Sequence, residues 1–130
     1  AQIAFALDWA AEQGPGPIGF TTACDVEALS RSQAAFGALP AARRAEALLG
    51  GIAAGLRARG HTRFSVAGGE TSGAVVTALG LGRLRALPEG ALGAGECLAD
   101  GPGPAPCWLF LKPGKLGDDE ILLRAAQTSP

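Results

Sequence analysis

The sequence predicts an α/β layered fold with a largely parallel sheet flanked by helices. From Pro40 onward, segments with helical spacing of apolar residues alternate with short apolar segments that are typical of buried strands. Two of these strand-like segments, residues 63–67 and 107–111, run directly into glycine-containing turns. In open α/β sheets ligands bind beyond the carboxyl ends of the strands, so the two turns are candidates for one binding site.

Length and composition indicate one domain with its own core. The chain has 130 residues, 48% of them hydrophobic, and a formal net charge of -1. A net charge this close to zero does not indicate a nucleic-acid-binding protein. No apolar segment is long enough to cross a bilayer. The first residues lack the basic segment of a secretion signal, so we expect a cytoplasmic protein without a membrane partner.

The three cysteines do not form a metal-binding pattern. Cys24, Cys97 and Cys107 lack C-x-x-C spacing, and the chain has a single histidine, His61, in a turn. We therefore expect free thiols that are buried or half-buried, an exposed histidine, and no protein-ligated metal.

The first 60 residues contain two predicted helices. Residues 2–13 have apolar residues at helical spacing, residues 14–17 end this helix, and residues 18–22 are expected to form a short strand. Residues 23–39 are interpreted as a solvated connection, with a short helix capped by Asp25 as the alternative. Pro40 is expected to open the best helix of the chain, which ends at Gly60.

The remaining elements follow from the same spacing rules. Residues 63–67 form the central strand, and a helix runs from Gly69 to Gly80. Residues 83–100 are expected to form an edge region with short strands. Residues 107–111 are typical of a buried strand, and the acids at 118–120 open the last helix, although they could instead hold Mg²⁺.

The turn after the central strand has the features of an anion site. Its sequence is Gly68-Gly69-Glu70-Thr71-Ser72-Gly73. A helix start leaves backbone N–H groups unpaired, and its dipole favours an anion such as a phosphate, while glycines let a ligand approach the backbone. The alternative is an ordinary strand-to-helix turn with Thr71 or Ser72 as the N-cap.

Both glycine turns resemble motifs of a known family. Residues 68–75, Gly-Gly-Glu-Thr-Ser-Gly-Ala-Val, are similar to the signature of the four-carbon acid sugar kinases, in their C-terminal nucleotide-binding domain. Residues 111–117 resemble a second motif of that family, usually Leu-Lys-Ser-Gly-Asn-Phe-Gly, but they carry Pro113, Lys115 and Leu116 in place of Ser, Asn and Phe. The resemblance extends from about Pro17 to the end of the chain.

The resemblance implies an ATP-binding domain of a kinase that phosphorylates four-carbon sugar acids such as threonate, erythronate or oxo-tetronate, with Mg²⁺. Residues 1–130 would be the C-terminal part of a longer two-domain kinase, whose N-terminal domain binds the sugar acid. The chain alone would then be inactive. A non-catalytic nucleotide- or phosphate-binding regulatory module is the alternative function, and whether the protein forms a homo-oligomer is left open.

The positions that match the family's nucleotide contacts receive the following expected roles. The amides of residues 69–72 hold phosphate oxygens, the Thr71 hydroxyl adds a donor or helps to orient the metal, and Glu70 orients a metal-bound water or a ribose hydroxyl. Gly114 leaves room for adenine or ribose. Lys112 or Lys115 compensates phosphate charge, although Lys115 could simply point to water. No catalytic base is assigned. The full set of cofactor-binding candidates is Gly68, Gly69, Glu70, Thr71, Ser72, Lys112 and Gly114.

Overall fold

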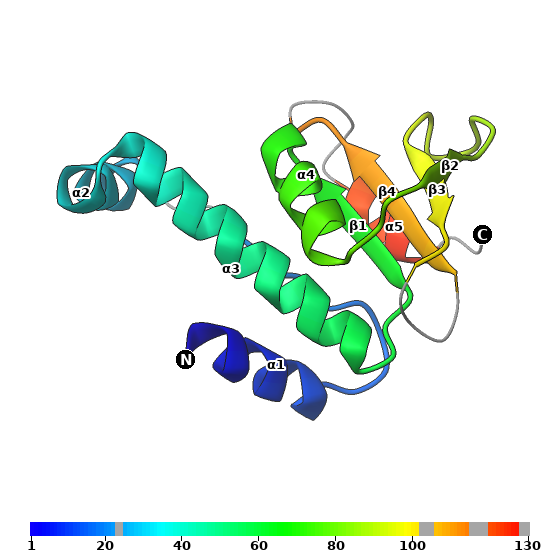
Figure 1. The fold of residues 1–130 in the computed structure, drawn as a ribbon, viewed down its shortest axis with the longest axis horizontal. Coiled ribbons are helices and arrows are strands. Elements are labelled where there is room, and N and C mark those ends of the chain that lie inside the picture. The colour runs from blue at the N-terminus through cyan, green and yellow to red at the C-terminus, as the bar shows by residue number, and fades with distance from the viewer. Residues whose placement is uncertain (23–24, 102–105, 115–119, 128–130) are drawn as a thin grey trace.

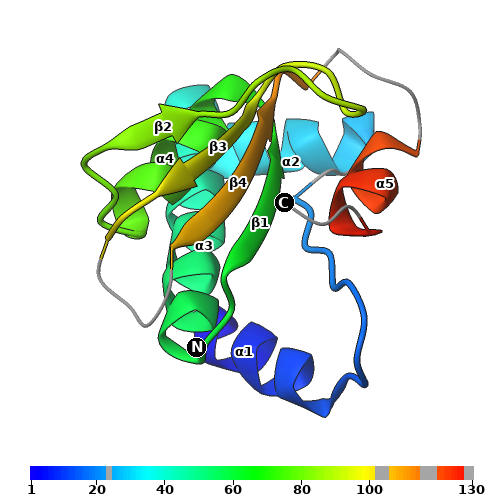
Figure 2. The ribbon, with the colours of Figure 1, turned by 90° about the vertical axis from the view of Figure 1, so that its right-hand side faces the viewer.

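The protein is an open four-stranded sheet with helices on both faces (Figures 1 and 2). The computed structural model describes residues 1–22, 25–101, 106–114 and 120–127. The strand order is β1-β4-β3-β2, so β4 is central and β1 is an edge strand. In chain order the elements are α1 (Gln2–Glu12), α2 (Val26–Phe36), α3 (Ala38–Ala58), β1 (Arg63–Ala67), α4 (Gly69–Ala78), β2 (Leu84–Ala86), β3 (Glu96–Ala99), β4 (Cys107–Lys112) and α5 (Ile121–Gln127).

The α/β class is confirmed, but the prediction of a largely parallel sheet is wrong. Only β1 and β4 are parallel, whereas β4 with β3 and β3 with β2 are antiparallel. Parallel neighbours need a crossover of a dozen or more residues, which the chain between β1 and β4 provides. The connections from β2 to β3 and from β3 to β4 are shorter than such a crossover, so those strands pair antiparallel.

The segment before α3 also differs from the expectation. Residues 18–22 are not a strand, because no strand of the described chain pairs with them, although Ile18 and Phe20 pack against the core. Residues 26–36 form a helix rather than a solvated connection. Asp25 caps it by accepting a hydrogen bond from the amide of Ala28 at 2.6 Å. This helix buries no residue, which explains why its sequence shows no clear apolar period.

The other predicted elements are found, except that residues 63–67 form the edge strand β1 and not the central strand. The helix expected from Pro40 begins two residues earlier, at Ala38, which leaves Pro40 in the first turn. The edge region contains β2 and β3, and the buried strand is β4. Of the three acids expected to open the last helix, Asp118 and Asp119 lie outside the described residues. No helix in the described ranges is long and apolar enough to span a membrane.

The core lies on both faces of β4. Cys107 and Leu109 pack with α3 and α4, whereas Trp108 and Phe110 pack with Ala125 of α5. These four β4 residues are at most 2% exposed. Alternation along a strand sends neighbouring side chains to opposite faces, so both layers of helices are fixed to this one strand.

Two of the cysteines belong to this core. Cys97 and Cys107 are free and buried, as expected, and Cys24 lies outside the described residues. Burial raises the pKa of both thiols, and the neighbouring Cys107 raises the pKa of Cys97 further. The positive charge of Arg57 lowers the pKa of Cys107, but by less than burial raises it, so the pKa of Cys107 is raised overall.

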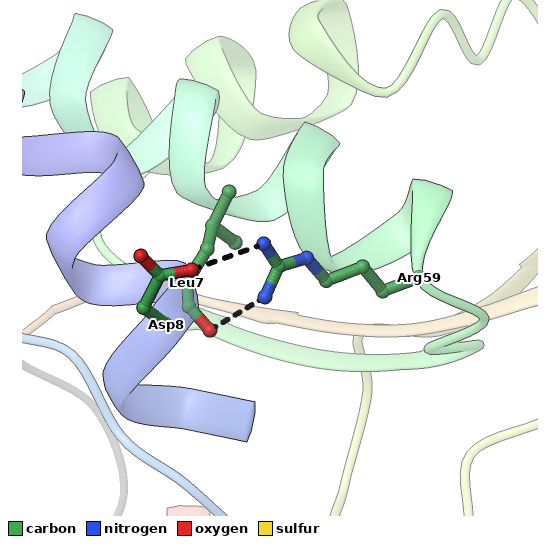
Figure 3. Close-up of polar contacts among 3 residues, drawn as sticks. All are labelled: Leu7, Asp8 and Arg59. Atoms are coloured by element: carbon green, nitrogen blue, oxygen red, sulfur yellow. Dashed lines mark hydrogen bonds and ion pairs between the residues drawn. The ribbon is translucent and has the colours of Figure 1, made fainter. Parts of the chain in front are cut away.

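Helix α1 is held against α3 by small residues and one arginine. Leu7 packs over Gly55, where an added methyl group would lie 2.9 Å from Leu7 Cδ2 and 3.2 Å from Cγ. Arg59 donates a hydrogen bond to the Leu7 carbonyl at 2.7 Å and lies 3.5 Å from the Asp8 carboxylate (Figure 3). Arg59 therefore joins two helices rather than forming part of a basic patch. The ion pair between Arg59 and Asp8 is exposed to solvent, so it contributes little to stability.

We predict that Gly55→Ala destabilises the fold although alanine is the better helix former. The new methyl group must displace Leu7, whose backbone is held by Arg59, and such overpacking costs about 1–3 kcal/mol. The control is Gly73→Ala in α4, where nothing lies within 4 Å of the added methyl group; this change should stabilise by about 0.5–1 kcal/mol. Urea unfolding of the two variants measures both effects. Equal stabilisation by both would contradict the packing of α1 on α3.

We predict that the buried thiols make the protein less stable at alkaline pH. The unfolded thiols ionise above their ordinary pKa, whereas the folded thiols, whose pKa is raised, stay protonated. The stability is therefore fully present below about pH 8.5 and is lost as the pH rises toward the folded pKa. Unfolding measured from pH 7 to pH 10 should show a smaller alkaline loss in Cys107→Ala. Rapid reaction of Cys97 or Cys107 with a disulfide reagent in the folded protein at pH 8 would contradict this prediction.

Candidate functional site

The start of α4 is an uncapped helix N-terminus. The N-cap is Gly68, with φ of 105°, and no side chain caps the helix. Positive φ is readily adopted by glycine, so Gly68 lets the chain turn from β1 into α4 without strain. The alternative in which Thr71 or Ser72 is the N-cap is therefore wrong, since both lie inside the helix.

This N-terminus offers three backbone donors. The amide of Gly68 donates to the Lys112 carbonyl at 2.9 Å, and the amide of Ser72 donates to the Gly68 carbonyl at 2.9 Å. The amides of residues 69–71 are the ones that a helix start leaves without an acceptor in its own backbone. The Ser72 amide already donates to the Gly68 carbonyl, so it is not available to a phosphate. Of the amides expected to hold phosphate, those of residues 69–71 remain.

The two glycine turns meet, as the sequence predicts. Ala67 and Lys112 are register partners in the parallel pair of β1 and β4, so both strands end at the same edge of the sheet. A methyl group added to Gly114 would lie 3.7 Å from the Gly68 Cα and 3.9 Å from its nitrogen. We call the place where Gly68, Gly69 and Gly114 approach one another the glycine corner.

The glycine corner is open to solvent. Gly69, Glu70 and Gly114 are exposed, and no atom lies within 4 Å of a methyl group added to Gly69. Thr71 is half-buried, with its Oγ1 3.6 Å from a methyl group placed on Gly68. A ligand can thus approach the free amides from outside, while the Thr71 hydroxyl stands beside the turn.

The hydroxyl of Ser72 is buried and does not stand beside the turn as that of Thr71 does. Its Oγ is inaccessible to solvent and has no hydrogen-bond partner. A hydroxyl in this position cannot donate to a ligand at the open surface without a change of rotamer. Sequence reasoning placed Ser72 with the ligand-binding residues because it considered only the motif and could not see the direction of the side chain.

Lys112 is buried and holds the second turn. Its Nζ donates to the Pro113 carbonyl at 2.6 Å and to the Gly114 carbonyl at 3.4 Å, and the residue is 8% exposed. An ammonium group has three donors, so these contacts leave one for another acceptor. Its side chain therefore fixes the turn beneath Gly114 and places a positive charge at the glycine corner. Lys115 lies outside the described residues.

Charge near the glycine corner is otherwise provided by the exposed carboxylate of Glu70 in the first turn of α4. An acid at this place interacts favourably with the helix dipole whether or not a ligand is present. Among the described residues no group of three His, Cys, Asp or Glu could hold a metal ion. Phosphate oxygens of a bound molecule would be suitable ligands for a divalent cation at this site.

A groove runs past the first turn of α4. It lies between α3 and α4, measures about 730 Å³, and has Glu70 and Gly73 in its wall. A second hollow, of about 480 Å³, lies between α1, α3 and residues 20–22, on another part of the molecule. Neither of these two hollows is lined by Gly68 or Gly114.

Comparison with known proteins gives one consistent family. The profile described as "Nucleotide-binding C-terminal domain" matches residues 1–122. A protein of Methylobacterium radiotolerans named 3-oxo-tetronate kinase is 44% identical over 124 residues, which are 95% of this chain and 29% of that protein. A protein of the same name from Pseudomonas fluorescens is 39% identical over 128 residues, 96% of this chain and 28% of that protein.

A solved structure agrees with this assignment at the level of the fold. It is that of a Salmonella typhimurium LT2 protein, provisionally described as a tRNA synthase, and has a TM-score of 0.76 and 33% identity. The match covers 95% of this chain and 30% of that one. The chain thus spans less than a third of the length of the curated relatives it matches. As the resemblance of its two glycine motifs predicts, the chain belongs to the family of nucleotide-binding C-terminal domains.

Proposed function

We propose that the glycine corner binds the phosphates of ATP, and that the chain is the ATP-binding domain of a kinase acting on four-carbon sugar acids. One observation carries the proposal: two side-chain-free turns meet at a helix N-terminus that no side chain caps. Backbone donors and the helix dipole at such a place attract phosphate. The relatives named 3-oxo-tetronate kinase support the choice of ATP and of the sugar acid.

The proposed contacts follow from the geometry. The amides of residues 69–71 donate to phosphate oxygens, and Lys112 adds positive charge from beneath the second turn. Gly114 has no side chain, so the sugar or base of the nucleotide can lie against the backbone there. Ser72 is proposed to act only as part of helix α4, whose dipole attracts phosphate, because its hydroxyl is buried.

Mg²⁺ would enter this site as a companion of the nucleotide. The Thr71 hydroxyl and the Glu70 carboxylate belong to the first turn of α4, and both suit a hard cation through water. Mg²⁺ would neutralise phosphate charge during transfer. Phosphoryl transfer relies on positioning and charge stabilisation, which this corner can provide for the donor.

The acceptor side of the reaction is proposed to lie outside these residues. We propose that residues 1–130 form the C-terminal part of a longer two-domain protein and that its other domain binds the sugar acid. We assign no catalytic base in this chain. A general base must lie within hydrogen-bond reach of the acceptor hydroxyl, so it would come from the sugar-acid domain.

The binding test uses Gly69→Glu in the full-length protein. The new acid occupies open space and suits the helix N-terminus, so the fold should keep its stability, but its charge repels phosphate. We expect calorimetry to show Mg-ATP affinity at least about tenfold weaker, since 1.4 kcal/mol of repulsion corresponds to that factor. Gly73→Glu, on the next turn of the same helix and also in open space, should change affinity much less. Equal effects of the two variants would remove the phosphate site from the glycine corner.

The same calorimetry separates the kinase from a regulatory module. ATP should bind more tightly than inorganic phosphate or sulfate, because the groove and the second turn add contacts beyond one phosphate. Equal affinity for ATP and phosphate would indicate a phosphate-binding module instead.

We predict that the full-length protein phosphorylates a four-carbon sugar acid with ATP and that Lys112→Gln lowers this activity. Removing one charge-assisted contact to phosphate should reduce kcat/KM by roughly 10- to 100-fold. A coupled assay measuring ADP release with threonate, erythronate and 3-oxo-tetronate tests it. Lys112→Arg, which keeps the charge, is the control. ADP release that does not depend on any of these acids would contradict the substrate class, while leaving ATP binding intact.

A further inference from the structure

Lys112 is a buried cation at the end of the central strand. It is the last residue of β4 and is 8% exposed. Alternation along β4 places it on the same face as Trp108 and Phe110, which is the face that α5 covers. Burial of an ammonium group costs free energy unless hydrogen bonds and an opposite charge compensate it. The groups around Nζ therefore decide whether this charge is compensated within the chain.

The described partners of the Lys112 ammonium group are two carbonyl groups. Nζ donates to the Pro113 carbonyl at 2.6 Å and to the Gly114 carbonyl at 3.4 Å. No carboxylate among the described residues forms an ion pair with it. An ammonium group has three donors, so the two carbonyls use two of them and leave the charge without a described counter-ion.

These contacts also change what the second turn can offer to an anion. A carbonyl oxygen is the negative end of a peptide group, so two carbonyls directed at a ligand would repel phosphate. Both carbonyls are instead bonded to the ammonium group. Pro113 has no N–H, so no amide is available at that position. The charged donor of Lys112 thus gives the second turn the character that backbone amides give the first.

We propose that the Lys112 ammonium group is a built-in monovalent cation of the glycine corner, and that a phosphate group of the nucleotide is its counter-ion. Two carbonyl oxygens and one phosphate oxygen would then use its three donors. This inference rests on the proposed function, because ATP supplies the phosphate. It adds two properties: the charge serves the ligand and not the fold, and the site needs no added cation such as K⁺.

Thermal unfolding of the full-length variant Lys112→Met tests whether the charge serves the ligand. Methionine has a similar length and no charge, and the exposed Pro113 and Gly114 carbonyls can bond to water instead. Without ligand we expect the thermal midpoint to fall by less than about 3 °C. The rise caused by Mg-ATP in the native protein should shrink to less than about half. A larger fall without ligand, or an undiminished rise with Mg-ATP, would overturn the proposal.

Arg57→Met is the matched control. Arg57 is the other buried charged residue of the described chain, at 5% exposure. Its Nη1 donates to the His61 carbonyl, at the opposite end of β1 from the glycine corner. This variant should keep the full rise in midpoint with Mg-ATP. Equal loss of the rise in both variants would contradict the proposal, because it would reflect the loss of any buried cation.

A rescue experiment tests the role of Lys112 as a cation directly. In full-length Lys112→Ala, calorimetry should show Mg-ATP binding about tenfold tighter in propylammonium chloride than in tetramethylammonium chloride at equal ionic strength. Only propylammonium has N–H donors and the shape of the deleted side chain. The native protein should bind Mg-ATP equally in both salts, because its site is already filled. No difference between the salts for Lys112→Ala, or the same difference for the native protein, would overturn the proposal.

Failure of this inference is distinguishable from failure of the proposed function. Mg-ATP binding that is weakened by Gly69→Glu but not by Lys112→Met would leave the phosphate site in place and remove Lys112 as its cation. Absence of any Mg-ATP effect on the native full-length protein would remove both.

Discussion

The candidate site depends on the parallel pairing of β1 with β4. This pairing sets Ala67 opposite Lys112, and one hydrogen bond, from the Gly68 amide to the Lys112 carbonyl, closes the ladder where both strands end. Because the strands are parallel, both turns leave the sheet at one edge; in an antiparallel pair they would lie at opposite ends. The approach of Gly114 to Gly68 is a direct consequence of this single pair of strands.

The core explains why this pair is held so firmly. Strand β4 is buried on both faces, by α3 and α4 on one side and α5 on the other, and Arg63 of β1 stacks on Trp108 of β4 at 4.2 Å. Hydrophobic burial has no direction of its own, but the alternation along β4 converts it into a fixed register. The exposed glycine corner can therefore lack side chains and still keep its geometry, since the residues that fix it lie one layer deeper.

The sequence was informative where local rules decide the outcome. The glycine motifs, the long α3 and the buried β4 all follow from short-range patterns, and so does the meeting of the two turns. The direction of β2 and β3 was predicted wrongly because it depends on connection length and not on composition. Helix α2 was missed because it buries nothing, and only its Asp25 cap signalled it. The inward Ser72 hydroxyl and the Lys112 contacts depend on side-chain direction, which no spacing rule contains.

A surface corner is a sufficient anchor for phosphate but not for a reaction. Three amides, a dipole and one lysine can hold a charged group, whereas neither of the two hollows described above is lined by Gly68 or Gly114. Water must be excluded for electrostatic contacts to have their full effect on phosphoryl transfer.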